Sequence, residues 1–215
     1  MNKIFEILNK YYGYNSFRKG QYEIISNILR GRDSFCILPT GAGKSICYQI
    51  PALMFNGITI VISPLISLMK DQVDNLNSNG INARYINSTQ KLEVSDEIIE
   101  LCKKGEVKLL YIAPEKLENE FFKRKLRLLN ISQIAIDEAH CVSMWGHDFR
   151  KSYGLIAEFI DNLRIRPVVT AFTATATEVV RKDVINLLKL RNPYICIGSF
   201  DRENLEIKLY IEEDK

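Results

Sequence analysis

The sequence of 215 residues has little of several features that would place a protein in a special class. Its five cysteines form no C-x-x-C pair, so neither a disulfide framework nor a zinc site is indicated, and reduced thiols are the simplest account. The longest apolar passage, residues 58–69, falls well short of the roughly 18 residues that a membrane span requires. We therefore expect a soluble intracellular protein, cytoplasmic or nuclear, with no membrane partner.

The net charge and the organisation of the chain are those of an ordinary globular domain. The 29 basic and 26 acidic residues give a net charge of +3, which permits a nucleic-acid partner without indicating one. The first ten residues mix charges with apolar residues and lack a cleavage site, which excludes a signal peptide. No repeat, low-complexity tract or flexible linker is visible. We expect helices over residues 1–30, packed on a main domain over residues 31–200.

Short β-rich runs alternate with segments of helical periodicity through the main domain. This alternation, with strands apolar on both faces, predicts an α/β fold in which helices flank a mostly parallel central sheet in three layers. After a first strand from Ser34, strands are expected at residues 58–63, 83–87, 107–113, 133–137, 167–173 and 194–197. Helical stripes expected to face the core are Leu65, Leu68, Met69, Val73 and Leu76; Val94, Ile98, Leu101 and Cys102; and Val180, Val184, Leu187 and Leu188.

A phosphate-binding loop is predicted where the first strand ends. Its Gly-Ala-Gly segment lets backbone N–H groups turn toward phosphate oxygens at a helix N-terminus. Lys44 would reach the β- and γ-phosphates, and Ser45 would bind Mg²⁺. The usual pattern begins with glycine, whereas Leu38 stands at that position, and Pro51 should kink the helix that follows. The predicted ATP-binding residues of the loop are Thr40, Gly41, Ala42, Gly43, Lys44 and Ser45.

Two adjacent carboxylates follow the strand predicted at residues 133–137. An NTPase needs one carboxylate for Mg²⁺ and usually a second for the attacking water. Asp137 is predicted to hold the metal, and Glu138 to orient or deprotonate the water. His140 completes the predicted catalytic set with Lys44. In a parallel sheet these groups should meet the phosphate loop at one edge, where the strands end.

The sequence Asp-Glu-Ala-His resembles the motif of superfamily-2 helicases, and residues 12 to about 204 resemble the first RecA-like domain of the RecQ DNA helicases. The resemblance implies a RecA-like P-loop NTPase fold and the motor of an ATP-dependent 3′-to-5′ DNA helicase acting in recombination and repair. Its implied cofactors are ATP and Mg²⁺. Its implied partners are single-stranded DNA and duplexes with a single-stranded tail. The family's phosphate loop likewise does not begin with glycine, so Leu38 fits it.

Residues 12–21 resemble the leading motif of the family, which implies that Tyr14, Arg18 and Gln21 contact adenine. The chemistry agrees, because glutamine can pair with the donor and acceptor of an adenine edge, while tyrosine and arginine can stack. Taken alone, this cluster would also fit a helix start with a surface arginine.

Two further stretches resemble motifs that act on the strand. Residues 63–72 are similar to the motif that contacts the single-strand backbone, where hydroxyls and amides meet phosphate oxygens. Residues 172–176 are similar to the motif that couples hydrolysis to strand movement. The implied DNA contacts are Ser63, Lys70 and the helix start near Leu65, and the implied coupling hydroxyls are those of Thr173 and Thr175.

Residues 141–150 contain the single tryptophan of the chain and one of its two histidines. Trp145 and Phe149 could each stack a base for roughly 1–3 kcal/mol, beside Arg150 for a phosphate. The stretch resembles the aromatic-rich loop that gives RecQ proteins their DNA-stimulated ATPase, which implies DNA contacts at Trp145, His147, Phe149 and Arg150. The residues alone leave a buried tryptophan with a hydrogen-bonded histidine as the alternative.

Neither a second phosphate-site lobe with an arginine finger nor a cysteine-rich zinc module of the kind found in the family is visible in the sequence. We therefore expect a fragment, with residues 201–215 as a connector to a second RecA-like domain and no zinc. Alone it should bind ATP weakly, hydrolyse it poorly and unwind nothing. Two alternatives stay open: an RNA helicase domain of the same superfamily, and a nucleotide-dependent binding module without unwinding activity.

Overall fold

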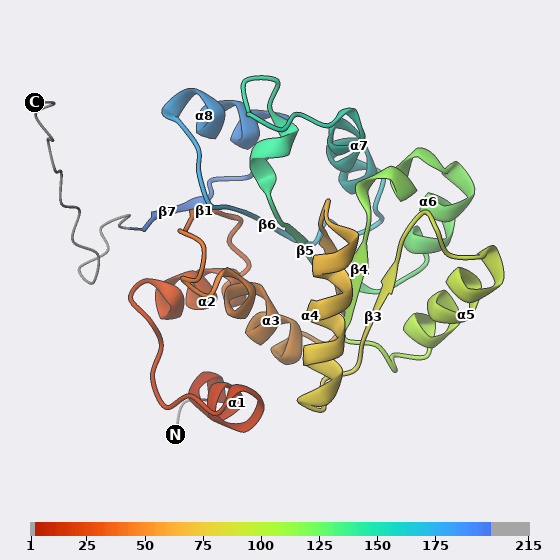
Figure 1. Cartoon of the computed structure of the whole chain (residues 1–215), viewed down its shortest axis with the longest axis horizontal. Helices are drawn as coiled ribbons and strands as arrows, with labels where there is room; N and C mark the ends of the chain where they lie inside the picture. The colour runs from red at the N-terminus through yellow and green to blue at the C-terminus, as the bar shows by residue number, and fades with distance from the viewer. Residues whose placement is uncertain (1–2, 199–215) are drawn as a thin grey trace, which may run out of the picture.

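Seven strands form one sheet within residues 3–198, the part of the chain that this computed structural model describes (Figure 1). The order across the sheet is β3-β4-β2-β5-β6-β1-β7, and every neighbouring pair is parallel. The strands are β1 (Ser34–Ile37), β2 (Ile58–Ile62), β3 (Ala83–Ile86), β4 (Leu109–Ile112), β5 (Ile131–Ile136), β6 (Val168–Thr173) and β7 (Tyr194–Ile197). The predicted parallel α/β sheet is confirmed, since the expected runs overlap these strands.

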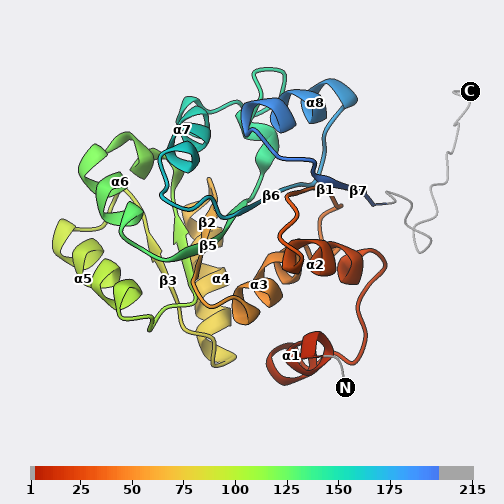
Figure 2. The ribbon, with the colours of Figure 1, turned by 180° about the vertical axis from the view of Figure 1, so that it is seen from behind.

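Helices cover both faces of the sheet and make three layers (Figures 1 and 2). One face packs on α2 (Gln21–Leu29), α3 (Lys44–Met54) and α4 (Ile66–Ser78). The other packs on α5 (Leu92–Lys103), α6 (Glu120–Arg127), α7 (Leu155–Asp161) and α8 (Glu178–Leu187). Helix α1 (Lys3–Tyr12) lies outside the first layer, where it buries Ile4, Ile7 and Leu8 against α2 and α3. Short 3-10 turns complete the chain: η1 (Pro114–Glu118), η2 (Ala139–Val142) and η3 (Lys151–Gly154).

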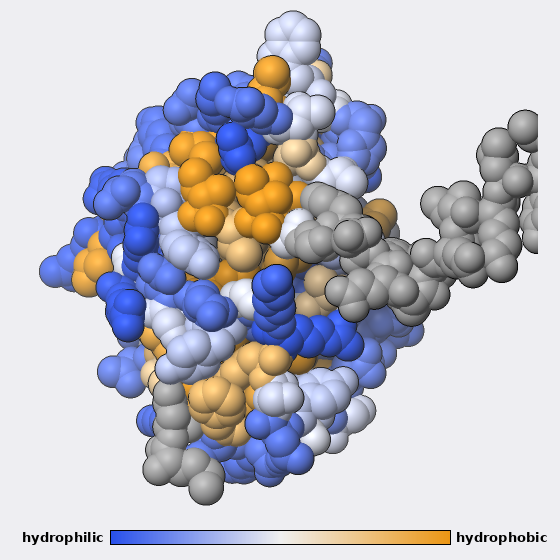
Figure 3. Space-filling view, turned by 90° about the vertical axis from the view of Figure 1, so that its left-hand side faces the viewer, coloured by the Kyte–Doolittle hydropathy of each residue, from blue (hydrophilic) through white to orange (hydrophobic). Residues whose placement is uncertain are grey.

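The strands form where apolar residues occur without alternation, because helices bury both faces of a parallel sheet. β2 (Ile-Thr-Ile-Val-Ile) is buried at all of its positions, and so is β4 (Leu-Leu-Tyr-Ile). β7 is different: it lies at the edge of the sheet and leaves Ile195 and Ile197 exposed. The face of the molecule on this side carries an apolar surface patch (Figure 3). Strands β2 and β4 are therefore enclosed between the two helical layers, whereas the sheet is open at the β7 edge.

Three residues of the predicted helical stripes are exposed, so the prediction that they face the core is wrong for them. Leu65 caps the start of α4, Val94 lies in the first turn of α5, and Leu187 is the last residue of α8. All three stand at helix ends, where the apolar face extends past its packing partners. Helix α3 runs without a break through Pro51 to Met54.

Every loop that follows a strand's carboxyl end lies along one edge of the sheet, because all the strands point the same way. This edge collects the loop after β1, the acidic pair after β5 and the threonines at the end of β6. Among the helices of the described residues, none combines the length and the apolar character that a bilayer span requires. The connector expected at residues 201–215 lies outside the described residues.

Candidate active site

A cavity of about 380 Å³ opens at the carboxyl edge of the sheet. It brings together groups from four separate parts of the chain: the segment before α2, the loop after β1, the start of α4 and the acidic pair after β5. Its size is within the range of small-molecule sites. The residues that line it are Tyr14, Ser16, Arg18, Gln21, Thr40, Gly41, Gly43, Lys44, Ser45, Ile46, Leu68, Gln72, Asp137 and Glu138.

The loop after β1 has the backbone geometry of an anion site. Gly41 and Gly43 have φ angles of 83° and 82°, a left-handed conformation that glycine adopts without strain. Helix α3 begins at Lys44, so the first amides of the helix have no hydrogen-bond partner within it. This end of the helix lies at the cavity, which Lys44 and Ser45 line. Lys44 Nζ donates to the carbonyl of Leu38 at 3.2 Å, which places the ammonium group across the loop. The loop thus presents N–H groups and one cation to an anionic ligand.

The acidic pair is held by the sheet itself. The amide of Asp137 donates to Ile62 O at 2.9 Å, which continues the β5–β2 pairing by one residue. Tyr153, fully buried in η3, donates its hydroxyl to Asp137 O at 3.0 Å. Glu138 then turns into the left-handed region with a φ of 47°. Its side chain is partly exposed, whereas Asp137 is buried.

The surroundings of the two carboxyls shift their pKa values in opposite directions. Burial raises the pKa of Asp137 to about 6, and the charge of Glu138 adds to this rise. The pKa of Glu138 is lowered, first by the hydrogen bond from His140 and further by the charge of Lys44. Two carboxyls pushed apart in this way can take different roles, one binding a cation and the other accepting a proton. Oxygen donors from Asp137 and Ser45 in one cavity suit Mg²⁺, which prefers such ligands.

His140 connects the acidic pair to β6. Its Nδ1 lies 2.8 Å from Thr173 Oγ1 and 3.3 Å from Glu138 Oε2. The Thr173 hydroxyl donates to Thr175 O at 3.0 Å, so we assign it as the acceptor of the proton on Nδ1. A continuous chain of polar contacts therefore runs from Glu138 to the stretch expected to couple hydrolysis with movement.

Two of the three residues expected to contact adenine hold the phosphate loop in this structure. The Gln21 amide donates to Ala42 O and Gly43 O at 3.2 and 3.1 Å, and Arg18 donates to Gly41 O. A Cβ at Gly43 would lie 2.4 Å from Gln21 Nε2, so a larger residue there would push the Gln21 amide away from the loop. Tyr14 is exposed at the cavity. Sequence reasoning missed this supporting contact, because a side-chain bond to a loop backbone leaves no residue pattern.

The stretch at residues 63–72 divides into a buried and an exposed part. Ser63 is only 2% exposed, and its hydroxyl lies near Asp137 without a hydrogen-bond partner among the described residues, so its contact with a strand stays a prediction. Leu65 and Lys70 are exposed, and the start of α4 has no side-chain cap, so its first amides are available. The exposed part thus keeps the chemistry for a phosphate contact.

The loop at residues 143–149 projects its aromatic side chains. Trp145 is 75% exposed, which rules out the alternative of a buried tryptophan, and Phe149 is exposed too. The Ser143 hydroxyl anchors the loop by donating to Asp183 at 2.5 Å and accepting from the Trp145 amide at 3.2 Å. Ser143 lies in the predicted aromatic-rich stretch but was assigned no role there, and Asp183 belonged to no predicted motif. No residue pattern indicates this bond, because the two residues lie 40 positions apart.

Two contacts connect this loop to the cavity. The ring of His147 stacks on that of His140 with centroids 4.3 Å apart. Arg150 donates to Pro64 O and to Asp148 Oδ2, both at 3.3 Å, and so bridges the loop to the start of α4. The residues expected at the nucleotide and those expected at the strand are therefore neighbours in space.

Comparison with known proteins agrees with this geometry. A family model described as DEAD/DEAH box helicase matches residues 18–183. The chain is 48% identical over 204 residues to the ATP-dependent DNA helicase RecQ of Pasteurella multocida and 51% identical over 210 residues to that of Bacillus subtilis. These matches cover 95% and 97% of this chain but 32% and 36% of the relatives, so the chain spans about a third of their length.

Solved helicase structures share the fold. The helicase domain of Pyrococcus furiosus Hef matches with a TM-score of 0.67 and 21% identity, over 87% of this chain and 38% of that one. The DUF1998 helicase MrfA bound to DNA matches with a TM-score of 0.75 and 19% identity, over 92% and 29%. At these identities the likeness concerns the RecA-like fold alone. From the family match, the fold and the motifs gathered at one edge of the sheet, the chain belongs to the DEAD/DEAH box helicase family and, within it, to the RecQ helicases.

Proposed function

We propose that this chain is the ATP-binding motor domain of an ATP-dependent 3′-to-5′ DNA helicase that acts in recombination and repair. One observation carries the proposal: Lys44 and Ser45 share a single cavity with Asp137 and Glu138, although more than 90 residues separate the two pairs. The polarity of movement comes from the resemblance to RecQ helicases.

The cavity fits a magnesium-bound nucleotide by the chemistry of its donors. ATP would supply the phosphoryl group that is transferred to water, and Mg²⁺ the charge that offsets its oxygens. The amides at the start of α3 and the ammonium of Lys44 would bind the phosphates. Asp137 and the Ser45 hydroxyl would hold the metal, whose charge would offset the burial and the nearby charge of Glu138 that raise the pKa of Asp137.

Glu138 is the general base in this proposal. Its lowered pKa keeps it ionised near neutral pH, ready to accept a proton from the attacking water. His140 orients Glu138 through Nδ1 and reports its state to Thr173 and, through the bond to the backbone, to Thr175. Tyr14, Arg18 and Gln21 would recognise adenine, Gln21 by exchanging its bonds with the loop carbonyls for bonds to the base.

The DNA strand would lie across the exposed residues next to the cavity. Trp145 and Phe149 would stack on bases, Arg150 and Lys70 would meet phosphates, and the amides near Leu65 would add hydrogen bonds. His147, stacked on His140, would transmit strand binding to the acidic pair. A second RecA-like domain, reached through residues 201–215, would close the cavity with an arginine. The parent protein would work where the chromosome is, in the nucleoid or the nucleus.

The test uses the full-length protein that contains this domain. The rate of ATP hydrolysis is measured without nucleic acid, with single-stranded DNA and with RNA of the same sequence. Unwinding is followed on a duplex with a 3′ tail. The proposal expects stimulation by DNA and unwinding of the tailed duplex. Stimulation by RNA alone would make it an RNA helicase, and nucleotide binding without turnover would make it a binding module. Either result would overturn the proposal.

A further inference from the structure

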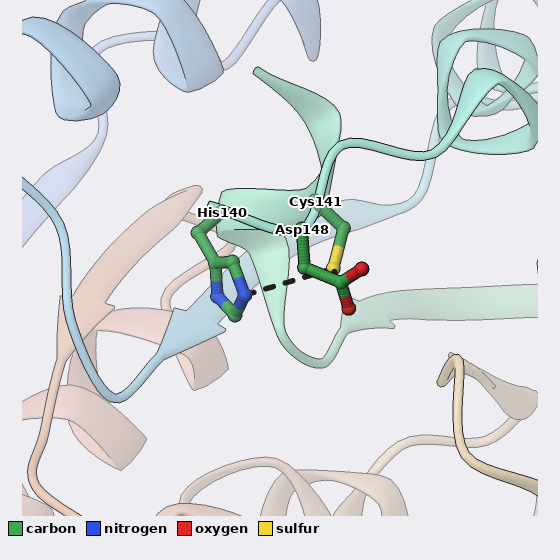
Figure 4. Close-up of side chains that lie close together, drawn as sticks. All are labelled: His140, Cys141 and Asp148. Atoms are coloured by element: carbon green, nitrogen blue, oxygen red, sulfur yellow. Dashed lines mark hydrogen bonds between the residues drawn. The ribbon is translucent and has the colours of Figure 1, made fainter. Parts of the chain in front are cut away.

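Three side chains with metal-ligating atoms converge beside the acidic pair, and the proposed ATPase uses only one of them. His140 and Cys141 are buried in η2, and the exposed Asp148 returns to them from the far end of the loop (Figure 4). One ligand atom from each lies within 4.8 Å of the others. The group has one nitrogen, one sulfur and one carboxylate donor, a mixture typical of Zn²⁺ and its substitutes.

The spacing of these atoms is close to what a tetrahedral ion requires. Zn–N or Zn–O bonds of about 2.1 Å and a Zn–S bond of about 2.3 Å at the tetrahedral angle separate sulfur from either partner by about 3.6 Å. Cys141 Sγ lies 3.7 Å from His140 Nε2 and 3.8 Å from Asp148 Oδ2. An ion could therefore enter with shifts of a few tenths of an ångström at the sulfur. The exposed Asp148 carboxylate, which lies within 4.8 Å of His140 Nε2, would have to approach it to about 3.4 Å.

The histidine is already oriented for a metal. Its Nδ1 proton is committed to Thr173 and Glu138, which leaves the lone pair of Nε2 directed at Cys141. A metal-binding histidine characteristically donates its other ring N–H to a carboxylate or another acceptor, which fixes the tautomer and the ring. The same contacts that orient His140 toward Glu138 thus also prepare its opposite nitrogen.

We propose that His140 Nε2, Cys141 Sγ and Asp148 form a binding site for Zn²⁺ or a similar thiophilic divalent cation, which ties the aromatic loop to the acidic pair. On binding, the Cys141 thiol releases its proton to solvent and the thiolate bonds to the ion. Without the ion, burial raises the pKa of the Cys141 thiol to about 12, and the charge of Asp148 adds to this rise.

Occupation of the site would change the loop. Asp148 would give up its ion pair with Arg150, which would then keep only its bond to Pro64 O. Trp145 and His147 would be fixed between two ligands of the same ion, Cys141 and Asp148. A cation bound there would hold the loop in one position. We expect the bound cation to inhibit any activity that requires the loop to move.

Cobalt provides the direct test, because a Co²⁺–thiolate bond absorbs light and can be titrated without any enzyme activity. The chain should bind one Co²⁺ with a thiolate charge-transfer band, and added Zn²⁺ should displace it. Cys141→Ser should abolish the band, whereas Cys102→Ser, which removes a buried thiol of α5 outside the group, should leave it unchanged. A band that survives in Cys141→Ser, or no band in the folded wild-type chain, would overturn the proposal.

A second measurement avoids any change in the core. Trp145 is the only tryptophan and lies within the loop that the ion would fix, so its fluorescence should respond to Zn²⁺ with a one-to-one end point. Asp148 is exposed, so Asp148→Asn should fold normally while it weakens Zn²⁺ binding by at least the tenfold that loss of a supporting partner costs. An identical titration in Asp148→Asn and wild type would exclude Asp148 as a ligand and contradict the site as proposed. Neither readout involves ATP, so a failure of the metal-site proposal can be distinguished from a failure of the helicase proposal.

Discussion

The cavity and the aromatic loop are neighbours, yet they are organised in opposite ways. In the cavity, Asp137 is only 9% exposed, and backbone or side-chain hydrogen bonds fix the groups around it. In the loop, Trp145 is 75% exposed and its ring has no aromatic partner among the described residues. The fold thus holds in place, by its own contacts, the groups that we propose to bind phosphate. The loop instead offers apolar area that a partner must cover, which is how exposed aromatic groups mark an interaction surface.

The strongest test of this contrast is Glu138→Gln. The substitution preserves shape but removes the proton acceptor, so hydrolysis by the full-length protein should fall by about 10²- to 10⁴-fold. Nucleotide affinity should stay close to wild type, because Glu138 is not expected to bind the phosphates. Glu97→Gln, on the exposed face of α5, is the matched control and should retain full activity. Steady-state hydrolysis and calorimetric binding measure the two effects, and an undiminished rate would remove Glu138 from its role.

The buried acid should lower stability in a pH-dependent way. Because the pKa of Asp137 rises from 3.8 to about 6 on folding, the native state holds this proton more tightly than the unfolded state does. The charged form therefore destabilises the native state above pH 6 by about 3 kcal/mol, and this penalty disappears as the pH falls toward 4. Asp137→Asn should raise the free energy of unfolding at pH 7.5 by up to about that amount and have little effect at pH 4.

Urea unfolding of the nucleotide-free chain at the two pH values measures this difference. A variant that is less stable than wild type at pH 7.5 would show that the carboxylate is stabilised in the cavity by contacts with Lys44 and its neighbours. The free-energy cost of the charged Asp137 in the folded site would then be smaller than its burial indicates.

The loop should show the reverse behaviour in Trp145→Ala. Because the ring is exposed, the free energy of unfolding should change by less than about 0.5 kcal/mol. Affinity of the full-length protein for single-stranded DNA should fall by about 1–3 kcal/mol, the value of one lost base stack. Phe159→Ala is the contrasting control: Phe159 is fully buried in α7, and its loss should destabilise the chain by about 3–5 kcal/mol. Unchanged DNA affinity in Trp145→Ala would assign the ring to another surface.

Much of this contrast was predictable from the sequence, for a physical reason. Strands buried on both faces read as continuous apolar runs, and parallel strands bring their following loops to one edge. That rule was enough to place Lys44 near Asp137 and Glu138. Glycine at positions 41 and 43 predicted a backbone that only glycine adopts easily, and the structure has it there.

The remaining features depend on contacts that periodicity does not encode. An apolar stripe specifies a helix face but not where its packing partner ends, which is why Val94 and Leu187 are exposed. The burial of Ser63 and the bonds from Gln21 to the loop carbonyls depend on the relative placement of elements. The approach of Asp148 to Cys141 depends on the path of a loop, and no spacing rule for metal ligands anticipates it.

The central claim is that Lys44 belongs to a nucleotide-phosphate site, and calorimetric titration of the chain with a magnesium-bound, non-hydrolysable ATP analogue tests it most directly. Wild type should bind one equivalent. Lys44→Ala should lose about 1.5–3 kcal/mol, or about 10- to 150-fold in affinity, because it removes a charge-assisted bond to phosphate. Lys70→Ala, which removes an exposed lysine of α4 outside the cavity lining, should bind like wild type. Equal affinity in wild type and a folded Lys44→Ala chain would contradict the account.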